Sequence, residues 1–268
     1  MAAWPPSLQV EGSPQPTNDS RRQPRSFVPL SGEGAPRQII CVPYAGADAG
    51  VFAPWVPLAA PVGVVATRLP GRGSRLRETP HRSIEAAFAD CAEELLDRVD
   101  RPTVLYGHSM GALLAYEFAA LLQVRRPQWL LGLVVAARPP PKFPPRLPLV
   151  GDAPDAVLLA ELASRYGQHT PPGLLADPAL AKLIVGTVRA DVTMAERYAP
   201  TSPAPLNVPV LALAGTDDLM APATDLDEWR ELALAGFTSA TLPGNHFFLT
   251  SHQRETVALI HASFFARK

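Results

Sequence analysis

The sequence predicts an α/β protein with a mainly parallel sheet that is covered by helices on both faces. Along most of its 268 residues, short runs rich in Val, Ile and Leu alternate with amphipathic stretches of helix length. The short runs are continuously apolar, which is typical of strands buried on both faces of a sheet. Strands that alternate with helices form parallel sheets through right-handed crossovers. The length fits one large α/β domain or two small ones.

The expected strands are these apolar runs. In chain order they cover 38–43 (QIICVP), 62–70 (VGVVATRLP), 103–108 (TVLYGH), 130–137 (LLGLVVAA), 209–215 (PVLALAG) and 238–244 (TSATLPG). The last run is the most polar and gives the weakest pattern. A short edge strand is also expected around Phe27 and Val28, before the first of the six.

The expected helices are longer stretches in which apolar residues recur with the helical period. They fit best at 84–100, 111–124, 222–235 and 251–266. Together, the strands and helices predict one domain over residues 26–268. Residues 1–25 form a leader rich in Pro and Ser, which we expect to be mobile because it cannot bury enough apolar surface to offset its ordering entropy.

One long segment interrupts the alternation of strands and helices. Between about 139 and 205 no strand is expected; a proline block, RPPPKFPPRLP, is followed by helical patterns near 154–166, 178–186 and 187–198. Binding sites lie at the carboxyl ends of parallel strands, and insertions between such strands commonly cover them. We therefore expect a helical lid. The alternative is a peripheral helical subdomain with no part in catalysis.

Composition excludes several classes of protein. With 24 Lys+Arg against 25 Asp+Glu, the formal net charge of −1 argues against a nucleic-acid binder. No run approaches the roughly 18 apolar residues of a membrane helix, and the N-terminus lacks the apolar core of a secretory signal. The two cysteines, Cys41 and Cys91, provide no disulfide framework and no thiol-cluster metal site. We expect a cytoplasmic protein.

Residues 107–111, GHSMG, form a G-x-S-x-G pattern. An expected strand runs into it and an expected helix runs out of it, which is the setting of a nucleophile elbow. The turn is sharp, and crowding by the neighbouring chain explains why Gly107 and Gly111 flank the serine. The pattern predicts Ser109 as a nucleophile at the positive end of the helix. The alternative is an ordinary helix N-cap with glycine neighbours.

A serine hydroxyl needs a base, and in this kind of fold the chain order is serine, acid, histidine. Most of the six histidines precede the serine or fall within the lid or the last helix: His81, His108, His169, His252 and His261. His246 alone follows the last strand in a loop, from which it can reach Ser109. His246 is therefore the predicted base, with a purely structural histidine as the alternative.

The acid is expected directly after strand 209–215, where two carboxylates follow each other. The G-x-x-D spacing from Gly215 favours Asp218, whereas Asp217 suits a loop or cap position. The acid's role is to hold the tautomer of His246 and to stabilise the imidazolium that forms during the reaction.

Acyl transfer also needs donors for the developing oxyanion. The backbone N–H of Met110, directly after the serine, is one. The second is expected from the loop after the first core strand, Pro43-Tyr44-Ala45-Gly46-Ala47, where we assign the N–H of Ala45. The alternative is an ordinary turn that contains glycine.

From about residue 25 to the C-terminus, the chain resembles the type II thioesterases that accompany polyketide synthases and nonribosomal peptide synthetases. The resemblance rests on a first-strand motif, a Pro-Gly-Arg loop, the elbow, a lid helix, and the acid and histidine motifs. In that order they are CVPYAGADAGVF (41–52), LPGRGSRL (69–76), LYGHSMGALLAYEFA (105–119), RADVTMAERY (189–198), LALAGTDD (211–218) and GNHFFL (244–249). The numbers of residues from the serine to the acid and from the acid to the histidine also resemble those of the family, which supports Asp218 over Asp217.

Three departures from the family pattern concern the backbone around the site. Ala47 replaces a second glycine, Asn245 replaces a glycine before the histidine, and Ala136-Ala137 replaces a usual Ser-Gly. All three leave the expected triad intact. They affect the shape of the pocket and therefore the preference among acyl chains.

The resemblance implies an α/β-hydrolase fold and the hydrolysis of acyl thioesters. Its typical substrates are aberrant or stalled acyl groups on the phosphopantetheine arm of an acyl or peptidyl carrier protein. The chemistry agrees, because a thiol with a pKa near 8.5 leaves readily, and no metal or organic cofactor is needed. The alternatives are a carboxylester hydrolase or acyltransferase on small acyl substrates, or a non-catalytic carrier-binding module.

A basic segment completes the candidate site. Residues 68–82 contain a single acid, Glu78, and five arginines: Arg68, Arg72, Arg75, Arg77 and Arg82. Carrier proteins are usually acidic, so we expect Arg72 and Arg75 to contact the carrier or the phosphate of its phosphopantetheine. The alternative is a solvated charged loop.

Overall fold

The computed structural model describes residues 26–32, 34–143, 147–167 and 176–266. Its centre is a seven-stranded sheet with the order β1-β3-β2-β4-β5-β6-β7. Only β1 is antiparallel to its neighbour, and all other pairs are parallel. The strands are β1 (Phe27–Pro29), β2 (Gln38–Val42), β3 (Gly63–Thr67), β4 (Thr103–His108), β5 (Leu130–Ala136), β6 (Val210–Gly215) and β7 (Phe237–Leu242). The mainly parallel sheet and its edge strand at Phe27 are confirmed. The leader expected at 1–25 lies outside the described residues.

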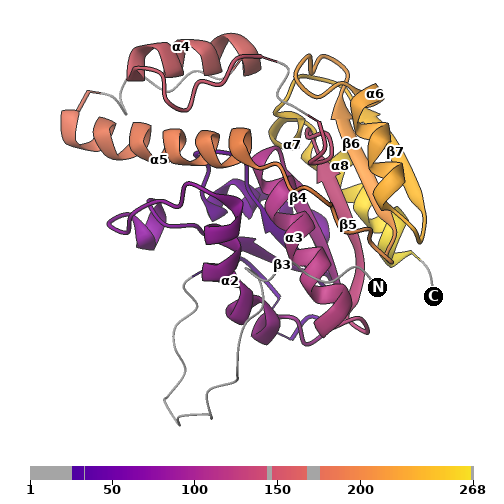
Figure 1. Cartoon of the computed structure of the whole chain (residues 1–268). Helices are drawn as coiled ribbons and strands as arrows, with labels where there is room; N and C mark the ends of the chain where they lie inside the picture. Colours follow the sequence, from indigo (N-terminus) through magenta and orange to yellow (C-terminus); the bar gives the residue numbers. More distant parts are fainter. Residues whose placement is uncertain (1–25, 33, 144–146, 168–175, 267–268) are drawn as a thin grey trace.

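Helices cover both faces of the sheet (Figure 1). One face carries α2 (Ile84–Arg98), α3 (Met110–Arg125) and α6 (Ala223–Leu226). The other carries the 3-10 helix η2 (Ala49–Trp55) with α1 (Val56–Ala59), α7 (Phe248–Ser251) and α8 (Gln253–Ile260). Strand β2 shows why the apolar runs are continuous. Ile40 and Val42 pack in the core on the face that carries α2 and α3, and Ile39 and Cys41 pack in the core on the face that carries α7 and α8.

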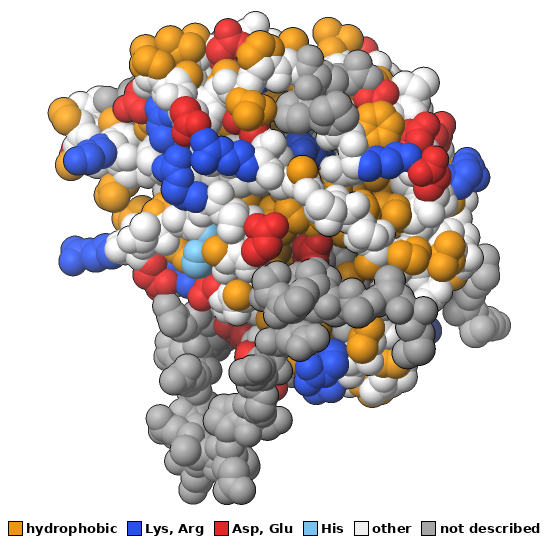
Figure 2. Space-filling model, viewed as in Figure 1, with side chains coloured by type: hydrophobic (Ala, Val, Ile, Leu, Met, Phe, Trp, Pro, Cys, Tyr) orange, Lys and Arg blue, Asp and Glu red, His pale blue; other side chains and the backbone are white. Residues whose placement is uncertain are grey.

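In the described part of the insertion between β5 and β6 there are two helices. They are α4 (Asp155–Tyr166) and α5 (Pro178–Arg197), which stack across one end of the sheet (Figure 1). A small core of their own joins them. The Tyr198 hydroxyl, just after α5, donates a hydrogen bond to the Glu117 carboxylate of α3. On the face seen in Figure 2, Lys and Arg side chains are interspersed with Asp and Glu around these helices.

The sequence predicts two helices over 178–186 and 187–198, but the structure forms the single helix α5. The expected boundary lies at Gly186, through which the helix continues. A glycine within a helix costs only about 1 kcal/mol relative to alanine. The apolar face of α5, with Val185 and Val192 in the core of the insertion, offsets that cost.

In two further stretches the sequence predicts one long helix, but the structure forms several short helical segments. Over 222–235, α6 is followed by the 3-10 helix η5 (Asp227–Leu232), and the chain then pairs with Leu206. The Leu206 N–H donates to the Leu232 carbonyl at 2.7 Å, which takes this part of the backbone out of a helical pattern. Over 251–266, the chain forms the end of α7, then α8 and a π-helical turn (His261–Phe265). None of the described helices is long and apolar enough to span a membrane.

Candidate active site

Ser109 lies in a sharp turn between β4 and α3, with φ +54° and ψ −119°. A Cβ atom on Gly107 would lie 2.3 Å from the Gly111 carbonyl oxygen, and one on Gly111 would lie 2.3 Å from the Val42 carbonyl oxygen. These neighbours are backbone atoms that cannot move aside, so both positions require glycine. The Ser109 N–H donates to the Ala136 carbonyl at 2.8 Å and holds the turn against the end of β5. Non-glycine residues with positive φ are strained by about 1–3 kcal/mol and cluster at functional sites.

The Ser109 hydroxyl faces a histidine and does not cap the helix. Its Oγ lies 2.9 Å from Nε2 of His246, and it makes no capping hydrogen bond to α3 although Ser109 occupies the N-cap position. His246 itself lies in the loop between β7 and α7 and is buried. This geometry favours the nucleophile interpretation of Ser109 over the N-cap alternative.

Asp218 completes a line of three side chains. Its Oδ2 lies 2.7 Å from Nδ1 of His246, and its Oδ1 accepts hydrogen bonds from the N–H groups of Met220 at 3.0 Å and Ala221 at 3.1 Å. Burial alone would raise the pKa of Asp218, but the hydrogen bonds from His246 and the two N–H groups lower it below its usual value. Asp217 is exposed and points to no catalytic partner in the described chain; its N–H donates to the Gly244 carbonyl.

Sequence reasoning missed a second histidine that supports the first. His108 is buried, and its Nε2 lies 2.7 Å from the His246 carbonyl oxygen, so Nε2 must carry the proton. Its Nδ1 then accepts a hydrogen bond from the Tyr106 hydroxyl at 3.0 Å. Burial, and the nearby His246, lower the pKa of His108 to about 3 and keep it neutral. The signal in the sequence is its position directly before the nucleophile, which excludes His108 as the base but places it beside the site.

The serine and histidine open onto a cavity of about 240 Å³ beneath the insertion. Apolar side chains from α4 and α5 form much of its wall: Leu159, Leu162, Ile184, Val188 and Val192. The ring of Tyr166, at the end of α4, lies 4.5 Å from the ring of His246. The insertion therefore covers the site, as the lid interpretation expects.

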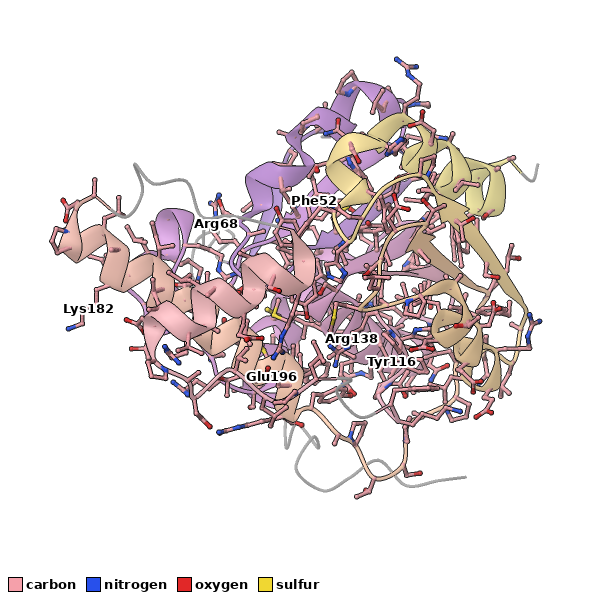
Figure 3. All side chains as sticks on the ribbon, turned by 90° about the horizontal axis from the view of Figure 1, so that it is seen from above. Phe52, Arg68, Tyr116, Arg138, Lys182 and Glu196 are labelled. Atoms are coloured by element: carbon pink, nitrogen blue, oxygen red, sulfur yellow. The ribbon has the colours of Figure 1, made fainter. Side chains whose placement is uncertain are left out.

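Three charged side chains also line this cavity, Arg138, Arg165 and Glu196. Arg138 follows β5, and its guanidinium donates to the Ala195 carbonyl at 2.9 Å. Glu196 accepts hydrogen bonds from the N–H groups of Val150 and Gly151, both at 2.9 Å. In the view from above, Arg138 and Glu196 lie at the end of α5 (Figure 3). The cavity thus combines an apolar wall with a polar end.

The two expected oxyanion donors line the same cavity. Ala45 lies in the loop after β2, and Met110 begins α3. Among the described residues, the N–H groups of Ala45 and Met110 have no protein acceptor. Both donors are therefore available to a bound substrate.

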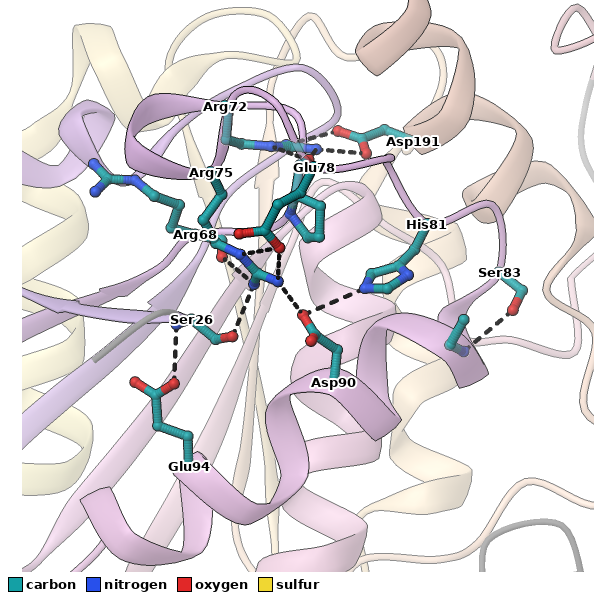
Figure 4. A network of polar contacts seen from close by, with 12 residues as sticks. Ser26, Arg68, Arg72, Arg75, Glu78, His81, Ser83, Asp90, Glu94 and Asp191 are labelled. Atoms are coloured by element: carbon teal, nitrogen blue, oxygen red, sulfur yellow. Dashed lines mark hydrogen bonds and ion pairs between the residues drawn. The ribbon is translucent and has the colours of Figure 1, made fainter. Parts of the chain in front are cut away.

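The structure corrects the expectation for Arg72 and Arg75. Only 5% of the Arg72 side chain and 3% of Arg75 are exposed. Arg72 forms a bidentate ion pair with Asp191, and Arg75 lies 2.8 Å from Asp90 (Figure 4). Buried guanidinium groups with carboxylate partners cannot contact the surface of a carrier protein, and neither arginine is a solvated loop residue.

No cluster of three or more His, Cys, Asp or Glu side chains suited to a metal ion exists among the described residues. The two cysteines are free and buried. The serine, the histidine and the carboxylate of the site form one hydrogen-bonded line.

This arrangement defines an α/β-hydrolase. A serine, a histidine and an aspartate are hydrogen-bonded in line at the carboxyl ends of a mainly parallel sheet, and the serine lies on a strand–turn–helix elbow. Residues 37–264 match the thioesterase domain family. The chain belongs to the thioesterase family, and its class of activity is thioester hydrolysis.

Similar proteins agree with this assignment. The gramicidin S biosynthesis protein GrsT of Aneurinibacillus migulanus is 30% identical over 221 residues, which cover 82% of this chain and 86% of GrsT. The type II thioesterase BorB from the borrelidin biosynthetic cluster has a TM-score of 0.79 at 31% identity, covering 89% of this chain and 97% of BorB. YbtT, a type II thioesterase from the yersiniabactin pathway, has a TM-score of 0.80 at 29% identity, covering 90% and 98%. The resemblance to type II thioesterases is confirmed.

Proposed function

We propose that this chain removes aberrant or stalled acyl groups from the phosphopantetheine arm of acyl or peptidyl carrier proteins during polyketide or nonribosomal peptide synthesis in the cytoplasm. The observation that carries the proposal is the hydrogen-bonded line from Ser109 through His246 to Asp218, whose serine faces a covered, partly apolar cavity. Relatives named as thioesterases of such pathways support the choice of substrate.

In the first half of the reaction, Ser109 Oγ attacks the thioester carbonyl while Nε2 of His246 takes the hydroxyl proton. The carbonyl oxygen becomes an oxyanion, which the N–H groups of Met110 and Ala45 stabilise. Asp218 stabilises the imidazolium and keeps the Nδ1 proton in place. Collapse of the tetrahedral intermediate leaves an ester on Ser109 and expels the phosphopantetheine thiolate, a good leaving group. The thiolate takes the proton from Nε2 of His246 and leaves the imidazole neutral for the second half.

In the second half, a water molecule gives its proton to His246 and attacks the ester carbonyl on Ser109. The same two N–H groups stabilise the second oxyanion. Its collapse returns the proton to Ser109 Oγ and releases the acyl group as a carboxylic acid. No step uses a metal or an organic cofactor, and the phosphopantetheine belongs to the substrate.

The size of the cavity favours short acyl groups. Its volume of about 240 Å³ lies below the roughly 300–1,000 Å³ of typical small-molecule sites. A full-length polyketide or peptide product would have to displace α4 or α5. We therefore expect kcat/KM to be highest for short acyl chains and to fall as the chain lengthens.

Carrier contacts are expected at exposed arginines, in place of the two buried ones. Arg82 and Arg197 are 54% and 55% exposed, and both approach Asp152, two residues after the cavity-lining Val150. Reversing the charge at both positions should raise KM for an acyl-carrier protein. KM for a short acyl thioester of a simple thiol should not change, because that substrate has no acidic surface.

The experiment that tests the proposed substrate compares three substrates with the same short acyl group. These are an acyl-carrier protein, a thioester of a simple thiol, and the matching oxygen ester. We expect kcat/KM to fall in that order, with intact-mass spectrometry reporting loss of the acyl group from the carrier. Preference for the oxygen ester would indicate a carboxylester hydrolase, and transfer to an added alcohol or amine without acid release would indicate an acyltransferase. Binding of the carrier without turnover would indicate a non-catalytic module.

A further inference from the structure

Helix α5 reaches from the acyl cavity to the loop that supplies the second oxyanion donor. On its buried side, Asp191 is 1% exposed and accepts a hydrogen bond from the Gly46 N–H at 2.8 Å. The same carboxylate pairs with both terminal nitrogens of Arg72 at 2.8 Å (Figure 4). Arg72 in turn donates to the Ala47 carbonyl at 2.9 Å. One ion pair therefore holds the loop at an N–H and at a carbonyl group.

Helix α5 is closely packed against the two loops that this ion pair joins. A Cβ atom on Gly46, which has φ +79°, would lie 2.8 Å from Cγ2 of Val188 on α5. One on Gly71, in the loop that carries Arg72, would lie 2.6 Å from Oγ1 of Thr187. Thr187 also donates a hydrogen bond to the Gly71 carbonyl at 3.0 Å. The helix thus lies directly against both loops, and a shift of α5 has to move them or break these contacts.

The hydrogen bonds to the Gly46 N–H and the Ala47 carbonyl hold the turn that sets the direction of the Ala45 N–H. The carbonyl of Tyr44 accepts a hydrogen bond from the Ala47 N–H at 3.1 Å, inside the turn. In a trans peptide the N–H of the next residue points opposite to that carbonyl, so the Ala45 N–H points out of the turn. Ala45 lines the same cavity as Ser109. The neighbouring peptide groups are the ones that Asp191 and Arg72 hold.

We propose that Asp191, paired with Arg72, is a positioning residue that presets the Ala45 N–H for the oxyanion and couples it to the seating of helix α5. The proposal rests on the proposed function, because it assigns a role to the oxyanion loop. Preset donors stabilise a developing charge without reorganisation during the reaction. The pairing with Arg72 also neutralises a buried carboxylate, whose unpaired charge near the site would oppose an oxyanion.

The test uses Asp191→Ala and two readouts that depend differently on the oxyanion. We expect kcat for a short acyl thioester to fall about 10- to 100-fold while KM stays within threefold. This loss is smaller than the roughly 10²- to 10³-fold loss on removing an oxyanion donor, because the Ala45 N–H is misplaced and not removed. A trifluoromethyl ketone analogue, which adds to Ser109 and forms an oxyanion, should lose affinity by a factor similar to the loss in kcat. Asp191→Asn keeps an oxygen that can accept from Gly46 and should recover part of the lost kcat.

The matched control is Asp90→Ala, which removes another carboxylate paired at 2.8 Å with a buried arginine, Arg75, away from the oxyanion loop. We expect this variant to lose thermal stability but to keep kcat within threefold of wild type. Equal losses of kcat in both variants would reduce Asp191 to a general structural role and overturn the proposal. A folded Asp191→Ala with unchanged kcat, or with a loss confined to KM, would also overturn it.

Should Asp191→Ala not fold, the comparison of Asp191→Asn with Asp90→Asn decides in the same way. Wild type and Ser109→Ala are measured in the same assay. If wild type fails to hydrolyse the thioester, or Ser109→Ala matches it, the proposed function fails. If only Ser109→Ala is inactive and Asp191 variants keep full kcat, the positioning role alone fails.

Discussion

Replacing Asp218 by Asn tests how the carboxylate orients His246, because the change keeps the shape and alters only the hydrogen-bonding groups. In the native site, Oδ1 faces the N–H groups of Met220 and Ala221, at 3.0 and 3.1 Å, and Oδ2 faces Nδ1 of His246 at 2.7 Å. An asparagine has to turn its oxygen toward the two N–H donors, since its NH2 group would otherwise face them. The NH2 group then points at Nδ1 and donates to it.

The size of the effect follows from these contacts. An imidazole that accepts at Nδ1 carries its proton on Nε2 and cannot take the proton of Ser109. Two backbone hydrogen bonds of about 1–1.5 kcal/mol each hold the amide in this orientation, which reduces the productive tautomer by roughly 30- to 160-fold. Loss of the charge-assisted hydrogen bond to the imidazolium removes about 1.5–3 kcal/mol more. Together they predict a fall in kcat of about 4 × 10²- to 3 × 10⁴-fold, a range that includes the roughly 10⁴-fold loss in serine proteases.

The assay measures thiol release from a short acyl thioester of a simple thiol, with circular dichroism to verify the fold. Asp217→Asn is the matched control, because Asp217 is the neighbouring carboxylate and is exposed; its kcat should stay within threefold of wild type. A folded Asp218→Asn that loses less than tenfold would refute the tautomer argument. A larger loss from Asp217→Asn than from Asp218→Asn would move the acid by one residue.

Two other predictions concern the triad as a unit and the stability of the fold. His246→Ala should lower kcat about as much alone as when it is combined with Ser109→Ala, because triad members act together; losses that multiply in the double variant would contradict this. The second prediction concerns Asp90. The contact with Nε2 of His81 at 3.3 Å and the ion pair with Arg75 outweigh burial and lower the pKa of Asp90 to about 2. Because the folded pKa lies below the unfolded value of about 4, its contribution to stability is present above pH 4 and is lost as pH falls toward 2. In Asp90→Asn, the free energy of unfolding should therefore fall less between pH 4 and 2 than in wild type, as measured by urea titration; an equal fall would show that Asp90 is not the titrating group.

The elbow and the order of the triad could be predicted from the sequence because their signals are local. A strand, a glycine, a serine and a glycine lie within a few residues of each other, and the crowding that requires both glycines acts within the same turn. Likewise, His246 was found because it alone follows the last strand in a loop. Such patterns can be read without knowing which distant segments meet.

The two arginines show where that reasoning fails. Five arginines in fifteen residues, 68–82, look like an exposed basic surface, yet the partner of Arg72 lies 119 residues away on α5. Nothing local announces that Asp191 will meet this guanidinium in a buried site. The support of His246 by His108 has the same cause, since it depends on a backbone carbonyl 138 residues away.

The most direct test of the account compares wild type with Ser109→Ala on one acyl-carrier protein, followed by intact-mass spectrometry of the carrier. Wild type should convert the acylated carrier to the form with a free phosphopantetheine thiol. The folded variant should leave the carrier acylated over the same time, because it lacks the hydroxyl that forms the acyl-enzyme in the hydrogen-bonded line of Ser109, His246 and Asp218. Turnover by Ser109→Ala within tenfold of wild type would contradict the assignment of Ser109 as the nucleophile.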